Sequence, residues 1–435
     1  MVLVSFYFLV IVAALFSVFS MLFDLETRHK LGVFLLITGS ASIYSLLTNY
    51  QYVFFASFIS FIMVVLAYLW SENIFTRFNI KRGLSKDKIF IGEEVNFELE
   101  IENKKLLPIP KITVKDYVTD GIEFVNENFF ASVPGTKANI FNDKFSLRWY
   151  EKVKKSYQLK TRQRGYYKFG EGDIFYQGIF GLFKNQISMN KYTELIVFPR
   201  ILSAKKLGLE FRQLFGSKLS EGWIHKDPLN KVGVRPYQTT DNIKKINWKA
   251  SARHNKIESD IYKPSYDREV HIFLSNNTTR DWWDGIIRNR LELAIIYAAS
   301  LVNYGINQGY QVGLYSDGLI KNSSRYISVS PGQSSSHKDK LLTTLAMLKA
   351  ASQVKFSKIL YQEKNNIRPG STVIIISSFL SAETERMINI YKNNYDLHLI
   401  KIGKNEKETK IPGVNTYFID EEEKLDEIQQ MKYNG

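Results

Sequence analysis

Hydrophobic residues form long uninterrupted runs in the first 70 positions of the chain. No charged side chain occurs between residues 2 and 23, and none occurs between residues 31 and 70. A membrane-spanning helix needs roughly 20 consecutive apolar residues. The runs therefore predict an anchor over residues 1–75 with two or three spans, at about residues 3–23, 31–48 and 52–70, of which the middle one is the weakest.

If the runs cross the membrane three times, the cationic side chains next to them all lie on one side of it. Arg28 and Lys30 follow the first run, and Arg77, Lys81 and Arg82 follow the last. The positive-inside rule places such residues in the cytoplasm. We expect a multi-pass protein of the cell membrane with its C-terminal bulk in the cytoplasm. A cleaved signal peptide is the poorer alternative, because the first run lacks a basic start and a small-residue cleavage site.

Apolar and polar residues alternate in short stretches over residues 76–200. The clearest stretch is 95–101, and similar ones lie at 88–92, 112–115, 145–149, 156–161 and 194–198. Alternation of this kind is typical of strands with one buried face. Several short strands separated by turns predict an immunoglobulin-like β-sandwich.

The pattern changes over residues 266–435, where apolar strands alternate with helical periodicity. Strands are expected at 269–274, 310–315, 372–376, 396–402 and 414–419, and helices at 282–303, 339–351, 383–392 and 421–431. This order predicts an α/β domain with a mainly parallel sheet and helices on both faces.

Composition narrows the classes of function. The chain has no cysteine, which excludes disulfides, thiolate zinc sites and thiol nucleophiles. Its net charge of +15 fits nucleic acid, an anionic membrane surface or an acidic partner. Because no nucleic-acid-binding motif is present, we expect membrane lipid and protein partners and no nucleic acid.

The segment 234–255, within a connector at 201–265, concentrates cations around two aromatic residues and one acid. Its candidate functional residues are Arg235, Tyr237, Asp241, Lys244, Trp248, Lys249 and Arg253. Asp241 is expected to cap a short helix from Asn242. The segment is interpreted as a brace within the chain, because Trp and Arg of this kind most often pack internally; a docking face for a partner is the alternative.

The same segment resembles the signature of the domain of unknown function 58 family. The resemblance rests on Arg-x-Tyr, then Asp, then the run Ile-Asn-Trp-Lys-Ala-Ser-Ala-Arg at 246–253, and on shorter matches at 91–95, 164–170 and 180–183. The family usually has His where this chain has Asn247, and Pro-Gly where it has Thr239 and Thr240. The resemblance implies a membrane anchor, a C-terminal von Willebrand factor A-like domain, and a MoxR-type AAA+ ATPase as partner. A membrane transglutaminase-like protein is a second implied partner.

Domains of the von Willebrand factor A type hold a metal through Asp-x-Ser-x-Ser after the first strand and a later Asp. The aligned positions here are Ser275, Asn277 and Thr279, with Ser378 at the later one. A divalent cation prefers carboxylate oxygens, so we expect a degenerate site without metal. A metal-dependent ligand-binding module is the alternative.

No sequence motif indicates catalysis. The chain lacks a Gly-x-Ser-x-Gly elbow, a His-Glu-x-x-His pair and a phosphate-binding loop. We therefore expect a non-enzymatic scaffold or adaptor without a cofactor. An enzyme of cell-envelope metabolism is a second alternative, for which Asp267 and Glu269 beside the first α/β strand are the candidate acids.

Overall fold

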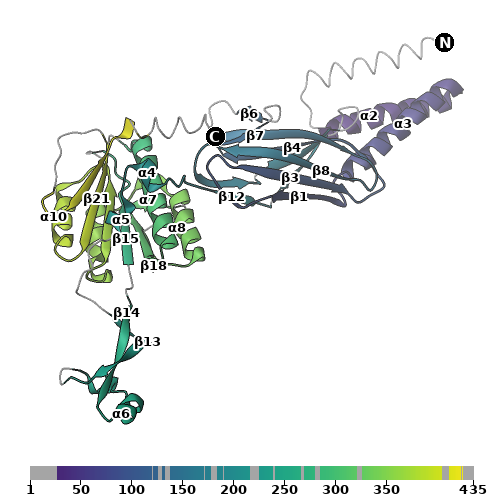
Figure 1. The fold of residues 1–435 in the computed structure, drawn as a ribbon. Helices are drawn as coiled ribbons and strands as arrows, with labels where there is room; N and C mark the ends of the chain where they lie inside the picture. The colour runs from purple at the N-terminus through teal and green to yellow at the C-terminus, as the bar shows by residue number, and fades with distance from the viewer. Residues whose placement is uncertain are drawn as a thin grey trace. The chain divides into compact units, whose positions relative to one another are not determined.

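The computed structural model divides the chain into two compact units, Met1–Val197 and Phe198–Gly435 (Figure 1). The residues it describes are 27–119, 121–125, 130–132, 138–170, 172–177, 184–189, 191–215, 225–238, 241–265, 269–279, 285–320, 326–403, 411–422 and 424. The protein is thus multi-domain and rich in β-structure, as the sequence predicts.

Two helices begin the described chain, α2 (Thr27–Leu47) and α3 (Gln51–Glu72), and they pack on each other. Within the described part, α3 is the one helix long and apolar enough to cross a membrane. The helix α2 covers nearly all of the expected middle span at 31–48, and Ile37–Leu47 is an apolar stretch of it that is too short to cross a membrane by itself. The expected span at 3–23 lies outside the described residues. The described chain therefore supports one candidate span and does not support the multi-pass arrangement.

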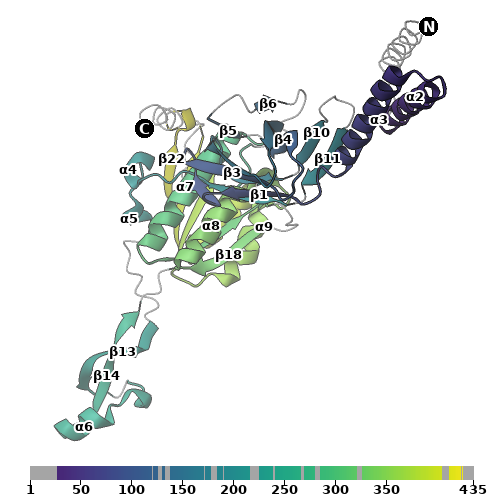
Figure 2. The ribbon, with the colours of Figure 1, turned by 90° about the vertical axis from the view of Figure 1, so that its right-hand side faces the viewer.

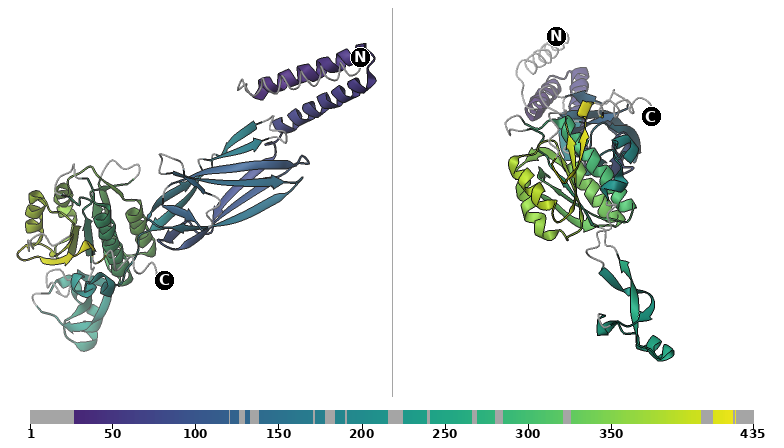
Figure 3. Two further views of the ribbon diagram at one scale, coloured as in Figure 1. Left: turned by 90° about the horizontal axis from the view of Figure 1, so that it is seen from above. Right: turned by 60° about the vertical axis from the view of Figure 1, so that its left-hand side comes forward.

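The remainder of the first unit is a β domain whose described residues form twelve strands. Their bounds are β1 (Phe78–Leu84), β2 (Lys88–Phe90), β3 (Glu94–Asn103), β4 (Ile109–Thr119), β5 (Ile122–Phe124), β6 (Phe130–Ser132), β7 (Ala138–Leu147), β8 (Lys152–Thr161), β9 (Gly165–Phe169), β10 (Gly172–Gln177), β11 (Lys184–Met189) and β12 (Thr193–Phe198). They form sheets in the orders β1-β3-β8-β5, β11-β10-β4-β7-β6 and β2-β12-β9. The left view of Figure 3 shows the strands as blue arrows.

The alternation expected at 95–101 is confirmed in β3. Its side chains Val95, Phe97, Leu99 and Ile101 are buried in the core of the domain, and the intervening ones lie at least partly in solvent. A period of two is what a strand with one buried face requires. Phe97 contacts a ring cluster that joins the sheets, since its centroid lies 5.4 Å from that of Phe169 and 5.9 Å from that of Phe141.

The second unit contains a six-stranded sheet in the order β18-β16-β15-β20-β21-β22. The strands are β15 (Glu269–Leu274), β16 (Gln311–Ser316), β18 (Ile327–Gly332), β20 (Thr372–Ser377), β21 (Asp396–Ile402) and β22 (Asn415–Ile419). All neighbouring pairs are parallel except β16 with β18. Every residue of β20 is buried, as expected for a strand that is covered on both faces.

Four helices accompany this sheet: α7 (Arg288–Asn307), α8 (Ser335–Met347), α9 (Phe356–Glu363) and α10 (Ala382–Tyr391). Figure 1 shows α7 and α8 on one side of the sheet and α10 on the other. The helix expected at 282–303 begins later, at Arg288, and the helix expected at 339–351 is displaced towards the N-terminus. The last residues of that expected helix instead belong to β19 (Lys349–Ser352), which pairs with the short strand β17 (Gly318–Leu319). Most of the helix expected at 421–431 lies outside the described residues.

The segment between the two domains has structure of its own. Two short helices, α4 (Ala204–Leu207) and α5 (Phe211–Leu214), pack on α7, where the Tyr297 hydroxyl donates to the Leu207 carbonyl at 2.8 Å. They are followed by an antiparallel hairpin of β13 (His225–Pro236) and β14 (Glu258–Ser265), which carries the helix α6 (Trp248–His254) at its end (Figure 2). The predicted signature residues lie in this hairpin.

Candidate functional site

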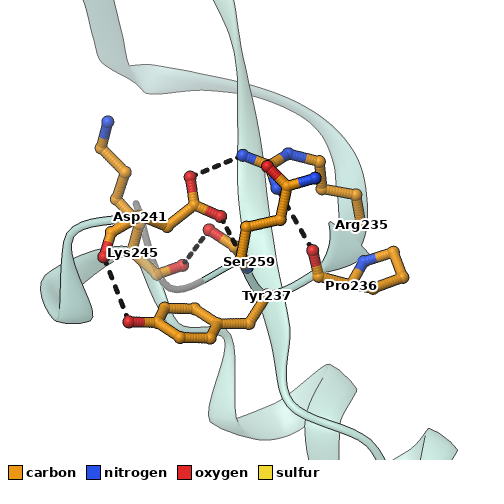
Figure 4. Close-up of polar contacts among 7 residues, drawn as sticks. Arg235, Pro236, Tyr237, Asp241, Lys245 and Ser259 are labelled. Atoms are coloured by element: carbon orange, nitrogen blue, oxygen red, sulfur yellow. Dashed lines mark hydrogen bonds and ion pairs between the residues drawn. The ribbon is translucent and has the colours of Figure 1, made fainter.

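Arg235 and Asp241 form the polar centre of the hairpin end (Figure 4). The Arg235 guanidinium lies 2.6 Å from one carboxylate oxygen of Asp241, and the other oxygen accepts the backbone N–H of Gln238 at 3.1 Å. The Tyr237 hydroxyl donates to the Asp241 carbonyl at 3.1 Å. Three of the predicted residues therefore meet, and they fix the loop that leaves β13.

The short helix expected from Asn242 is a single 3-10 turn at Ile243–Lys245, and the next helix, α6, is capped by Asn247. The Asn247 side chain accepts the Ala250 N–H at 3.0 Å, which makes it the N-cap of α6, and it donates to the Asp260 carboxylate at 2.7 Å. The contact with Asp260 ties α6 to β14. The departure from the usual family residue thus forms a regular helix cap, because Asn is among the preferred residues there. The Asp241 carboxylate contacts Arg235 and the Gln238 N–H in the loop before α6.

The remaining predicted residues of the hairpin face solvent. Trp248 is 69% exposed, and Lys249 and Arg253 are exposed on the same helix. The expectation that Trp248 packs within the chain is wrong, since α6 is held by its cap and has no buried residue. The side chain of Lys244 lies outside the described residues. The brace interpretation therefore applies to the Arg235, Tyr237 and Asp241 group alone.

Among the described side chains of this hairpin, Trp248 is one of three large hydrophobic ones that lie on the surface. Ile243 is 70% exposed and Ile257 is 54% exposed. The backbone joins them, because the N–H of Asn247, next to Trp248, donates to the carbonyl of Glu258, next to Ile257. The cations Lys249, Arg253 and Lys256 of the same segment are exposed as well. We call these six residues the hairpin patch.

A second group of polar residues lies at the carboxyl edge of the parallel sheet. A hollow of about 730 Å³ is bordered there by the ends of β15, β16 and β20 and by the first turns of α9 and α10. Its polar lining includes Ser275, Asn277, Asp317, Ser352, Ser381 and Glu383. Two of the four positions aligned with the metal motif, Ser275 and Asn277, are therefore in it.

Asp317 also lies at this edge, although it is not one of the positions aligned with the metal motif. It directly follows β16 and is 2% exposed. Its carboxylate accepts the Asn276 N–H at 2.6 Å and the Ser352 hydroxyl at 3.3 Å. Burial raises its pKa to about 7, because the cost of burying the charge exceeds the opposing effect of these hydrogen bonds. The signal in the sequence was an acid at the carboxyl end of an apolar strand, where ligand sites of parallel sheets lie.

The residues at this edge do not fit a divalent cation. Both oxygens of the Asp317 carboxylate already accept hydrogen bonds, and Asn277 accepts the Thr279 N–H at 3.4 Å. The Thr279 hydroxyl donates to the Gly285 carbonyl at 2.7 Å, and Ser378 is not part of the lining. Across the part of the chain that the structure describes, no cluster of three or more His, Asp or Glu side chains is placed to hold a metal.

The acid considered for catalysis has ion-pair partners at the opposite edge of the sheet. Glu269 lies 3.0 Å from the guanidinium of Arg368 and 3.5 Å from the imidazole of the buried His271. The His271 hydrogen bond and the charge of Arg368 lower its pKa against the effect of burial. Asp267, the other candidate, lies outside the described residues. Glu269 is therefore a paired carboxylate with a lowered pKa at the amino edge of the sheet.

Comparison with known proteins agrees with the resemblance in the hairpin. A family described as a protein of unknown function, DUF58, matches residues 233–433, and the match spans the hairpin end and the α/β domain. The uncharacterized protein YeaD of Bacillus subtilis (strain 168) is 22% identical over 307 residues, which cover 67% of this chain and 69% of that protein.

Solved structures resemble smaller parts of the chain. A β-glucosidase from Listeria innocua in complex with gluconolactone is 16% identical, with a TM-score of 0.19 over 29% of this chain and 16% of the enzyme. A CARDB domain from Pyrococcus furiosus in complex with di-metal ions is 15% identical, with a TM-score of 0.18 over 28% of this chain and 89% of that domain.

Proposed function

We propose that this protein is a non-enzymatic, membrane-anchored scaffold or adaptor of the DUF58 family whose hairpin patch binds a protein partner. The observation that carries the proposal is the exposure of Trp248, Ile243 and Ile257 together on one small hairpin. Trp is enriched among the residues that dominate binding energy at interfaces. Exposed apolar residues in a group, rimmed by charge, mark interaction sites.

Side-chain contacts hold the loop and the helix that carry this patch in a defined conformation. The Arg235 to Asp241 contact fixes the loop, and the Asn247 to Asp260 contact fixes the helix that carries Trp248. A pre-ordered surface loses less conformational freedom on binding. Because the patch includes the cations Lys249, Arg253 and Lys256, the fitting partner has an apolar pocket with an acidic border. A MoxR-type AAA+ ATPase is the partner that the family resemblance favours.

The remaining parts of the proposal concern the two domains and their side of the membrane. The β domain is proposed to be an immunoglobulin-like sandwich, and the α/β domain a metal-free von Willebrand factor A-like domain. The mainly parallel sheet with a hollow at its carboxyl edge supports the second assignment. The cations Arg77, Lys81 and Arg82 after α3 support a cytoplasmic location for both domains.

The binding proposal is tested with the full-length protein in lipid nanodiscs. Immobilised protein is exposed to a purified MoxR-type ATPase from the same genome, with and without ATP. We expect saturable binding that Trp248→Ala weakens at least tenfold. Tyr361→Ala is the matched control, because Tyr361 is 71% exposed on α9, outside the patch, and should leave binding unchanged. Equal binding by all three proteins, or none by any, would remove the proposal.

Nucleic acid is the competing ligand for a basic surface that carries an exposed aromatic residue. Binding to DNA or RNA depends steeply on salt, because counterions are released from the phosphates. We expect no such binding by the same nanodisc preparation at low salt. Salt-dependent binding that Lys249→Ala and Arg253→Ala abolish would replace the adaptor proposal with a nucleic-acid one.

A further inference from the structure

The C-terminal end of α3 is fastened to the β domain by side-chain contacts from both partners. The indole N–H of Trp70 donates to the Pro108 carbonyl at 3.0 Å. The Asn185 side chain on β11 donates to the carbonyl of Ser71 at 2.6 Å. Just beyond the helix, the Lys105 ammonium donates to the carbonyls of Asn73, Ile74 and Thr76, and its side chain is buried among them. The domain is therefore attached directly at the end of the candidate span.

The loop that contains Lys105 is bound to the turn between β7 and β8. The Tyr150 N–H donates to the Lys105 carbonyl at 3.1 Å. The buried Asn103 side chain donates to the carbonyls of Leu107 at 2.9 Å and of Arg148 at 2.8 Å. Loop and turn thus form one surface, and one edge of it is continuous with the end of α3.

This surface exposes three large hydrophobic side chains. Leu106 is 72% exposed, Trp149 is 63% exposed and Tyr150 is 66% exposed. Tyr150 has a positive φ of 49°, a backbone conformation that favours Asn or Gly over an aromatic residue. An aromatic side chain is therefore held at the tip of the turn against local backbone preference. We call Leu106, Trp149 and Tyr150 the aromatic tip.

Exposed cations accompany the aromatic tip. Arg77 follows α3, Lys104 precedes the tip residue Leu106, and Arg148 precedes Trp149. The backbone joins the first two, because the Lys104 N–H donates to the Arg77 carbonyl at 3.0 Å. Tyr and Trp with flanking Lys and Arg are the composition of a protein surface at the membrane interface.

We propose that the aromatic tip inserts into the headgroup region of the bilayer that α3 crosses, with Arg77, Lys104 and Arg148 on anionic lipid. The proposal rests on the proposed membrane attachment of α3. The Lys105 side chain binds the carbonyl of Asn73, which directly follows the helix end at Glu72. The bilayer surface is therefore the apolar partner within reach of the tip. This docking would fix the orientation of the β domain relative to the bilayer.

The absence of cysteine from the chain makes a depth measurement direct. Single variants Trp149→Cys, Val125→Cys and Ile59→Cys carry an environment-sensitive fluorophore in the full-length protein. Each is reconstituted in vesicles of phosphatidylcholine and phosphatidylglycerol that contain spin-labelled lipid as quencher. Val125 is the control, because it is 50% exposed and pairs with Gln158, roughly 20 Å along β8 from the tip at about 3.3 Å per residue.

We expect strong quenching at position 59 within α3, intermediate quenching at 149 and at least threefold weaker quenching at 125. Quenching at 59 with none at 149 leaves the membrane attachment standing and overturns docking of the tip. Absence of quenching at 59 overturns the attachment itself, and the docking proposal fails with it. Equal quenching at 149 and 125 also contradicts docking, because it means that the domain lies on its side.

A second experiment separates the aromatic and cationic contributions. Leu106→Cys is labelled with and without Trp149→Ser and Tyr150→Asn, the latter chosen because Asn accepts a positive φ. We expect the two substitutions to reduce quenching at 106 at least twofold, and vesicles without phosphatidylglycerol to reduce it further. Quenching at 106 that is unchanged in both comparisons contradicts the proposal. Circular dichroism of each variant confirms that the β domain is folded.

Discussion

The carboxylate of Asp317 accepts the backbone N–H of Asn276 at 2.6 Å, so a buried acid after β16 closes the loop that leaves β15. Burial raises the pKa of Asp317 to about 7. In the unfolded chain the carboxyl group titrates near pH 4. Between these two values the folded protein binds more protons than the unfolded chain, so this group lowers the stability of the α/β domain as the pH rises.

Replacing Asp317 with Asn is expected to remove this pH dependence. Asn keeps an oxygen that accepts the Asn276 N–H but cannot ionise. At pH 8, the free energy of opening measured by hydrogen exchange in β15 and its following loop should be higher in D317N than in the native protein. The expected difference is about 2–4 kcal/mol, because each pKa unit corresponds to 1.36 kcal/mol. At pH 4 the two proteins should differ little. A native protein whose protection is equal at pH 5 and pH 8, after correction for intrinsic exchange, would contradict the prediction.

The buried ion pair of Arg82 and Asp116 in the β domain provides a second prediction. The two side chains are 5% and 2% exposed, and the guanidinium lies 3.3 Å from the carboxylate. Burial lowers the pKa of Arg82 and raises that of Asp116, so desolvation outweighs their attraction. Asp116→Ala leaves a buried cation without its partner and is expected to destabilise the domain by about 3–5 kcal/mol.

The double variant Arg82→Met with Asp116→Leu is the control for that prediction. It removes both charges at similar volume, and such replacements are often neutral or stabilising. Urea unfolding of the full-length protein in detergent, followed by hydrogen exchange of β1 and β4, measures both variants. A double variant that is less stable than Asp116→Ala would contradict the prediction, because it would mean that the attraction within the ion pair exceeds the desolvation cost of burying it.

The cap of α6 is expected to have a measurable but moderate effect. Asn247→Ala removes the acceptor for the Ala250 N–H and the donor to Asp260, and loss of an N-cap costs about 1 kcal/mol. Asn247→Ser keeps the capping acceptor and loses the contact with Asp260. Hydrogen exchange of residues 248–254 should therefore be fastest in the Ala variant and intermediate in the Ser variant. Partner binding should follow the same order, because this helix presents Trp248.

The carboxyl edge of the sheet is expected to bind no divalent cation at millimolar concentration. Of its two acids, Asp317 already accepts two hydrogen bonds and Glu383 pairs with Lys355. Ser275 and Asn277 supply only neutral oxygens. Isothermal titration of the full-length protein with Mg²⁺, Ca²⁺ and Mn²⁺ checks this, with the Asp317→Asn variant as control. Saturable heat that the variant lacks would restore the metal-dependent ligand-binding alternative.

Strands with strong alternation or complete burial were predicted well from the sequence. The ranges expected for β15 and β21 agree with the structure, and β3 agrees in the side chains that it buries. These strands carry their own signal, because burial on one or both faces dictates their apolar pattern. The hairpin strand β13 was missed, since its sequence, which contains Lys226, Asp227 and Asn230, has no such pattern.

The sequence by itself determined the apolar helix that can cross a membrane, the β-rich first unit and the α/β order of the second. These depend on local composition and on periods of two and 3.6 residues, which need no partner to be read. It also provided the contact group of Arg235, Tyr237 and Asp241, because these residues lie within seven positions of one another.

Only the tertiary structure decided which side chains meet and which stay exposed. Asp317 reaches Asn276 because parallel strands bring their carboxyl ends to one edge, although the residues are 41 positions apart. Trp248 faces solvent because a local cap and β14 already hold its helix. Leu106 and Tyr150 share a surface because β3 and β8 pair along their length. Such contacts depend on chain topology, which hydrophobic patterning does not specify.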